Sequence, residues 1–174
     1  MILSVANNEL WPALLLTALA CLLLGMEVPT TAAYVICVSV AGPALVQLGL
    51  EPLLVHLFVF WFALLSTITP PVCGAVFIAA GMVEENWLKV AGSAMALGVG
   101  LYLIPLVMIV KPELISLVQT PGNALIAFVQ SALGLTAISY GIIAKRMNWW
   151  RVPLLIIGSM LLFGFGIDAI IGPE

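Results

Sequence analysis

The stretch Ser66-Thr67-Ile68-Thr69-Pro70-Pro71-Val72-Cys73-Gly74 (STITPPVCG) lies inside residues 53–83, which are otherwise almost wholly apolar. Proline lacks a backbone N–H and its ring clashes with the preceding turn, so two prolines in succession break a helix. The residue before the pair, Thr69, is pushed out of the α region as well. We therefore predict a discontinuous helix with three hydroxyl groups beside the break.

The composition is that of an integral membrane protein. Of the 174 residues, 64% are hydrophobic and 7% are charged, whereas soluble domains are about 25% charged and less than half apolar. The net charge of −3 and the lack of a basic run exclude nucleic acid as a partner. The three cysteines have no Cys-x-x-Cys spacing, which argues against a zinc site or a disulfide framework. The sequence contains no recognisable nucleophile–base set, metal cluster or phosphate loop, so we predict no catalytic residue, no cofactor and no enzymatic activity.

A spanning helix needs about 20 apolar residues, and by that measure the chain has five hydrophobic units. The first covers 12–48 and is interrupted at Gly25-Met26-Glu27-Val28-Pro29, and the second is 53–83. The other three read as single spans, at about 91–110, 122–144 and 153–171.

The first unit is best explained as a hairpin. Residues 12–24 would form a helix of about 20 Å, which is too short for a hydrocarbon core of about 30 Å. The return arm, 30–48, is expected to be interrupted at Gly42-Pro43. We predict a re-entrant hairpin with its tip at GMEVPTT, although a kinked span also fits.

Basic residues set the orientation of membrane helices. The clearest basic cluster, AKRMNWWR, contains Lys145, Arg146 and Arg151. We predict that this loop is cytoplasmic, that Trp149 and Trp150 lie in the interfacial belt, and that the C-terminus is on the outer side. Lys111 falls on the outer side against the rule, close in sequence to Glu113.

Backbone groups freed at a break need partners, because the bilayer core supplies none. Breaks therefore mark sites that are buried in protein or line a polar cavity. Helix N-termini favour anions and C-terminal carbonyls favour cations, and secondary transporters hold substrate and coupling ion in this way. An alternative is that proline and threonine only kink packed helices. Two breaks in adjacent units, each with proline and hydroxyl groups, favour a binding site for an ion such as sodium.

The order of two motifs carries a family resemblance. The stretch Gly25-Met26-Glu27-Val28-Pro29-Thr30-Thr31-Ala32 is followed, at the family's spacing, by Thr69-Pro70-Pro71-Val72. These motifs resemble the large membrane subunit of tripartite ATP-independent periplasmic (TRAP) transporters, with most similarity to the fused four-plus-twelve-helix permeases of the TAXI type. The likeness covers about residues 15–113.

The resemblance implies an all-α integral membrane fold: a helical bundle with a re-entrant hairpin and a discontinuous helix, as in elevator-type ion transporters. The fold would be partial, with 1–113 as the C-terminal half of the transport domain and 114–174 as two additional helices. Sodium would sit at the hairpin tip and the helix break, with substrate beside it. The implied ion- and substrate-binding residues are Gly25, Met26, Pro29, Thr30, Thr31, Ser66, Thr67, Thr69, Pro70 and Pro71.

The implied function is that of a multi-pass permease component in the prokaryotic inner (plasma) membrane. It would serve a binding-protein-dependent, sodium-coupled secondary transporter that imports small organic acids or similar solutes, with a periplasmic C-terminus. The expected partners are the remaining N-terminal part of the permease, a periplasmic solute-binding protein, the small organic solute and the lipid bilayer. The alternative is a non-transporting scaffold, or an inert remnant of a split or truncated permease.

Two residues are left with open roles. Glu27 stands where the family commonly has a small or apolar residue, and a carboxylate buried in a membrane is expensive. It could ligate a cation, take up a proton or face water. His56 is most simply a packed or interfacial histidine, with proton coupling as the alternative.

Overall fold

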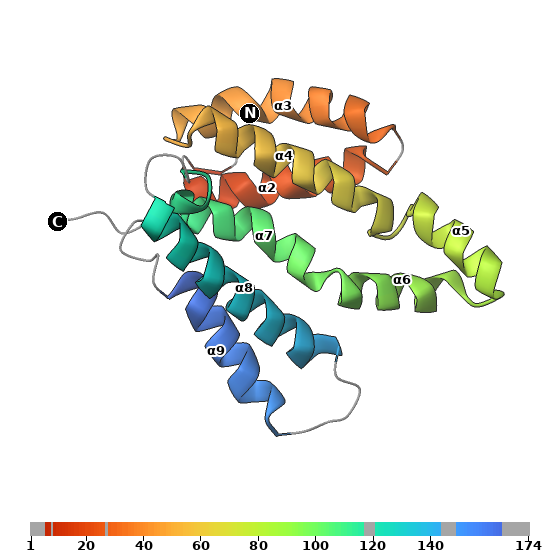
Figure 1. Cartoon of the computed structure of the whole chain (residues 1–174). Coiled ribbons are helices and arrows are strands. Elements are labelled where there is room, and N and C mark those ends of the chain that lie inside the picture. The colour runs from red at the N-terminus through yellow and green to blue at the C-terminus, as the bar shows by residue number, and fades with distance from the viewer. Residues whose placement is uncertain (1–5, 8, 27, 117–120, 144–148, 165–174) are drawn as a thin grey trace. The chain divides into compact units, whose positions relative to one another are not determined.

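The computed structural model describes residues 6–7, 9–26, 28–116, 121–143 and 149–164, and these form helices and the turns between them. The chain divides into two compact units, Met1–Met95 and Ala96–Glu174. The elements, labelled in Figure 1, are α2 (Leu10–Leu24), α3 (Thr30–Gln47), α4 (Pro52–Leu65), η1 (Ser66–Ile68), α5 (Gly74–Val83), α6 (Trp87–Leu97), α7 (Val99–Val110), η2 (Pro112–Leu114), α8 (Pro121–Ile143) and α9 (Arg151–Phe163).

In the first unit, α2, α3 and α4 pack against one another side by side (Figure 1). Their shared core is apolar and includes the fully buried Leu14, Leu45 and Phe58. Large apolar side chains also cover the outer faces, among them Leu15 and Val40. Helices that are apolar all round suit a hydrocarbon environment rather than water.

The predicted break in the second hydrophobic unit is confirmed. Helix α4 runs into the 3₁₀ turn η1, and the backbone then becomes extended at Thr69, with φ −97° and ψ 125°. Helix α5 does not begin until Gly74. The two prolines therefore separate two helical segments, as their missing N–H groups require.

Two other predictions about helix continuity are wrong. Helix α3 runs unbroken through Pro43, where an interruption was expected. A proline removes only one N–H from the helix, and membrane helices tolerate that loss where neighbouring groups compensate. Conversely, the predicted single helix at 91–110 is divided at Gly98, whose backbone has φ −83° and ψ 3°. Glycine is the weakest helix former after proline, and this conformation lies outside the α region.

By length and composition, α3 and α8 are the described helices that could each cross a membrane alone, and α6 with α7 would make one further span. Helix α2 has 15 residues, and it counts among the shorter apolar helices. At 1.5 Å per residue it is about 22 Å long. That length agrees with a hairpin arm, so the re-entrant hairpin remains our prediction.

In the second unit, α8 and α9 pack closely through glycines. A Cβ atom added at Gly158 would lie 2.9 Å from the backbone oxygen of Gly134, and one added at Gly134 would lie 2.7 Å from Leu162. Such small residues let membrane helices approach at backbone distance. At the other end of the pair, Gly141 faces Leu155 in the same way.

Basic side chains cap both helices of this pair. Arg151 Nε donates to the carbonyl of Gly141 at 2.7 Å, near the C-terminus of α8. Lys111 Nζ donates to the carbonyl of Leu161 in α9 and to Gln130 Oε1 in α8, each at 2.9 Å. Cations at helix C-termini are favoured by the helix dipole. Lys111 is 4% exposed. Its two bonds to α8 and α9 account for a basic residue on the predicted outer side, where the orientation rule does not expect one.

Candidate ion and substrate site

The residues predicted for the hairpin tip lie in the turn between α2 and α3. Gly25 is the C-cap of α2 and is buried, and Met26 is half-buried. Pro29 is the N-cap of α3, which begins with the half-buried Thr30 and the exposed Thr31. Glu27, between them, lies outside the described residues, as do Lys145 and Arg146 of the basic loop.

The residues predicted for the break lie at and after the end of α4. Ser66 is fully buried, and Thr67 follows it in η1 with partial exposure. Thr69 and Pro70 are half-buried, and Pro71 is exposed. The break therefore has a buried start and an accessible end.

The hairpin tip contacts the helix break directly, through Gly25 and Ser66. A Cβ atom added at Gly25 would lie 2.7 Å from Ser66 Cβ and closer still to Ser66 Oγ. It would also lie 3.0 Å from the backbone oxygen of Cys21. Only glycine fits at this position without a shift of its neighbours. The structure thus brings together two motifs that lie far apart in the sequence.

The contact joins two helix C-termini. Gly25 is the C-cap of α2 and Ser66 is the C-cap of α4. Each helix ends in carbonyl groups that carry partial negative charge. No Asp, Glu, Lys or Arg occurs within α2, α3 or α4, and His56 lies in the first half of α4, away from its C-terminus. Glu27 of the tip lies outside the described residues, and among the described groups the C-termini of α2 and α4 favour a cation.

The three hydroxyls at the break all donate to carbonyls of the preceding turn. Ser66 Oγ donates to Ala63 O at 2.7 Å, and Thr67 Oγ1 donates to Leu64 O at 2.8 Å. Thr69 Oγ1 donates to Leu65 O at 2.7 Å. These bonds give the last carbonyls of α4 side-chain donors. Each hydroxyl oxygen keeps lone pairs that can accept a further interaction.

Two helix N-termini also lie in the two motifs: α3 begins after the tip, and α5 begins after the break. Neither α3 nor α5 has a side-chain cap at its start, since Pro29 and Cys73 occupy the N-cap positions. The first intrahelical bond of α3 runs from Ala33 N to Pro29 O, so the N–H groups before it have no partner within the helix. Such N–H groups are suited to an anion, for example a carboxylate.

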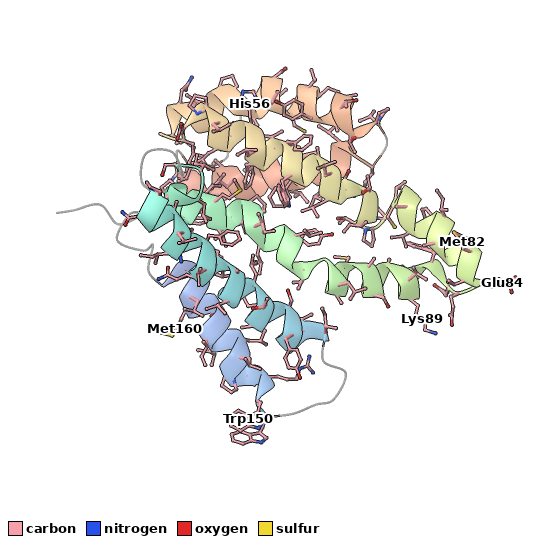
Figure 2. The ribbon with its side chains drawn as sticks, in the orientation of Figure 1. His56, Met82, Glu84, Lys89, Trp150 and Met160 are labelled. Atoms are coloured by element: carbon pink, nitrogen blue, oxygen red, sulfur yellow. The ribbon has the colours of Figure 1, made fainter. Side chains whose placement is uncertain are left out.

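One residue near the tip escaped the sequence analysis. Tyr34 Oη lies 2.7 Å from His56 Nδ1, and the pair connects α3 to α4. The Tyr34 ring also packs edge-on against Phe60, with centroids 5.8 Å apart. His56 is labelled in Figure 2 on α4, on the side that meets α3. The sequence feature that could have pointed to Tyr34 is its spacing, because it follows Thr30 by one helical turn on the same face.

Comparison with known proteins assigns the family. The family model for the tripartite ATP-independent periplasmic transporter, DctM component, matches residues 1–123. Searches of curated proteins and of solved structures find no match. The matched region contains both the hairpin tip and the helix break, whereas nearly all of α8 and the whole of α9 lie beyond it. The chain belongs to the DctM family, the large membrane component of TRAP transporters, and is a permease component rather than a soluble protein.

Proposed function

We propose that this chain forms part of a sodium-coupled permease that imports small organic acids with the help of a periplasmic solute-binding protein. The observation that carries the proposal is the contact between Gly25 and Ser66, which places the C-terminal ends of α2 and α4 against each other. Two negative dipole ends in contact are stabilised by a cation between or beside them. Membership of the DctM family supplies the transport setting.

In this proposal the oxygen atoms of Ser66, Thr67 and Thr69 are the side-chain ligands of the sodium ion. Their hydrogens point to backbone carbonyls, so their lone pairs are directed away from those carbonyls. Hard cations prefer such oxygen ligands. The uncapped N-termini of α3 and α5 would attract the carboxylate of the solute. Sodium would then lie at helix C-termini, and the carboxylate of the solute would lie at helix N-termini.

The test is radiolabelled uptake by the chain expressed together with the remaining part of the permease and its binding protein. Uptake of a small carboxylate should require an inward sodium gradient and should fail when choline replaces sodium. Uptake that follows a proton gradient without sodium would overturn the choice of coupling ion. A complete lack of uptake by a correctly inserted complex would favour the scaffold or remnant.

A further inference from the structure

We infer that the hydrogen bond between Tyr34 and His56 is a positioning contact that holds the hairpin tip on the helix break. The inference rests on the proposed function only in taking the tip and the break as the ion site. Neither residue touches the break itself in the described contacts. Both act through the helices that carry the tip and the break.

The two residues lie on the helices that carry the tip and the break. Tyr34 is one turn beyond Thr30, where α3 begins immediately after the tip. His56 belongs to α4, the helix that ends at Ser66. A bond between these two side chains therefore fixes the tip-bearing helix against the break-bearing helix. The edge-on contact of Tyr34 with Phe60, one turn nearer the break, acts in the same direction.

The bond between Tyr34 and His56 differs in kind from the bonds of the neighbouring hydroxyl groups. The hydroxyls of Thr17, Ser39, Ser66 and Thr67 bond within their own helix, so they do not fix one helix against another. The bond between Tyr34 and His56 is directional and joins two helices at 2.7 Å. In a lipid environment no hydrophobic driving force holds helices together, so interhelical hydrogen bonds contribute to the preference for one register over another. A directional polar bond can supply that preference.

His56 lies at the surface and not in the apolar core. The imidazole is exposed and borders an open groove of about 490 Å³ between α3 and α4, lined also by Gly42, Pro43 and Gln47. Replacing His56 therefore leaves no cavity in the core. Variants at this position should fold, which makes the positioning role testable without loss of the protein.

The experiment is hydrogen exchange measured by mass spectrometry on the full chain in lipid nanodiscs. The parent is compared with Tyr34→Phe, His56→Leu and His56→Asn. The first two variants remove the bond, whereas asparagine places an amide oxygen near the position of Nδ1 and can still accept from Tyr34. The readout is exchange of the tip amides of Gly25 and Ala33, which donate to Cys21 O and Pro29 O, with the α8 peptides as an internal control.

Tip exchange should rise about two- to tenfold in Tyr34→Phe and in His56→Leu. It should remain at the parental rate in His56→Asn, and the double variant Tyr34→Phe/His56→Leu should exchange no faster than either single variant. Unchanged tip exchange in the single variants would overturn the inference. So would a uniform rise across α2, α3 and α4, because the pair would then serve overall stability. The readout involves no transported ion, so its failure and the failure of sodium-coupled uptake are distinguishable.

Discussion

Gly25, at the end of the first hairpin arm, packs directly on Ser66, the residue at which the next long helix stops being regular. The space for a side chain at Gly25 is already filled by Ser66 Cβ and by the backbone of Cys21. The contact is therefore sensitive to a single methyl group.

We expect Gly25→Ala to lift the tip from the break. Overpacking a tight contact costs about 1–3 kcal/mol, and the hairpin can avoid that cost by moving away. In the assembled permease, sodium-dependent uptake should fall at least about tenfold. Gly81→Ala is the matched control, because a Cβ there meets nothing within 4 Å. Parental uptake by Gly25→Ala would show that the tip need not rest on Ser66.

Thr69→Ala should weaken sodium binding. Thr69 Oγ1 donates to Leu65 O, and its oxygen is a proposed ligand. We expect the sodium concentration for half-maximal uptake to rise about three- to tenfold, while Thr69→Ser stays near the parent. Ser39→Ala is the control, because Ser39 Oγ makes the same kind of bond to Val35 O in α3, away from the break. An unchanged sodium dependence in correctly inserted Thr69→Ala would assign this threonine a purely structural role.

The orientation prediction can be tested with alkaline phosphatase fusions in a bacterial host. Arg151 holds the carbonyls of Gly141 and Ile142 at the start of α9, and the adjacent Trp149 and Trp150 rings stack with centroids 4.2 Å apart (Trp150 is labelled in Figure 2). A basic residue and two exposed tryptophans at one end of α9 favour the cytoplasmic interface. A fusion after Gly172 should be active and a fusion at Asn148 inactive. High activity at Asn148 would reverse the topology.

The sequence predicted structural features best where they depend on local chemistry. Pro70 and Pro71 break a helix in any surroundings, so the position of the break was predictable. Pro43 and Gly98 show the limit, because α3 continues through the first and the helix ends at the second. At Pro43 the helix continues despite the low propensity of proline, whereas the division at Gly98 follows the low propensity of glycine.

The long-range contacts of the candidate site could not be predicted from the residues alone. The two helix breaks predicted an ion-binding site on physical grounds, and the family resemblance assigned the motifs around Gly25 and Ser66 to it, but neither predicted their direct contact. The bond between Tyr34 and His56 gave no sequence signal beyond spacing. Lys111 stands near Glu113 in the sequence, yet its ammonium group bonds to Gln130 and Leu161. Such partners depend on how α8 and α9 pack, which no local pattern encodes.

Lys111 should make the stability of the second unit depend on pH. Burial lowers the pKa of the Lys111 ammonium from its ordinary value of 10.5, and the negative charge of Glu113 opposes this only in part. The folded chain therefore releases this proton before the unfolded chain does. Its stability should rise as pH increases through the lowered pKa toward 10.5. The measurement is the thermal midpoint of the parent minus that of Lys111→Met in detergent. This difference should grow with alkaline pH, and a flat difference would contradict the assignment.

The two prolines at the break provide the most direct test of the site. At the break, side-chain hydroxyls donate to the carbonyls of Ala63, Leu64 and Leu65. Alanine favours a helix over proline by about 3 kcal/mol per position. The double variant Pro70→Ala/Pro71→Ala should therefore offer N–H groups to the carbonyls of Ser66 and Thr67, one turn earlier, and extend α4 through the break.

The helix end that we propose to bind sodium would then disappear. We expect the double variant to insert into the membrane as well as the parent and to lose sodium-coupled uptake in the assembled permease. Pro43→Ala and Pro105→Ala are the matched controls, because both prolines lie inside continuous helices, α3 and α7. Both controls should retain uptake, because neither change removes a helix end at the tip or the break. Parental uptake by the inserted double variant would reduce the prolines to an incidental kink and remove the basis for an ion site at this break.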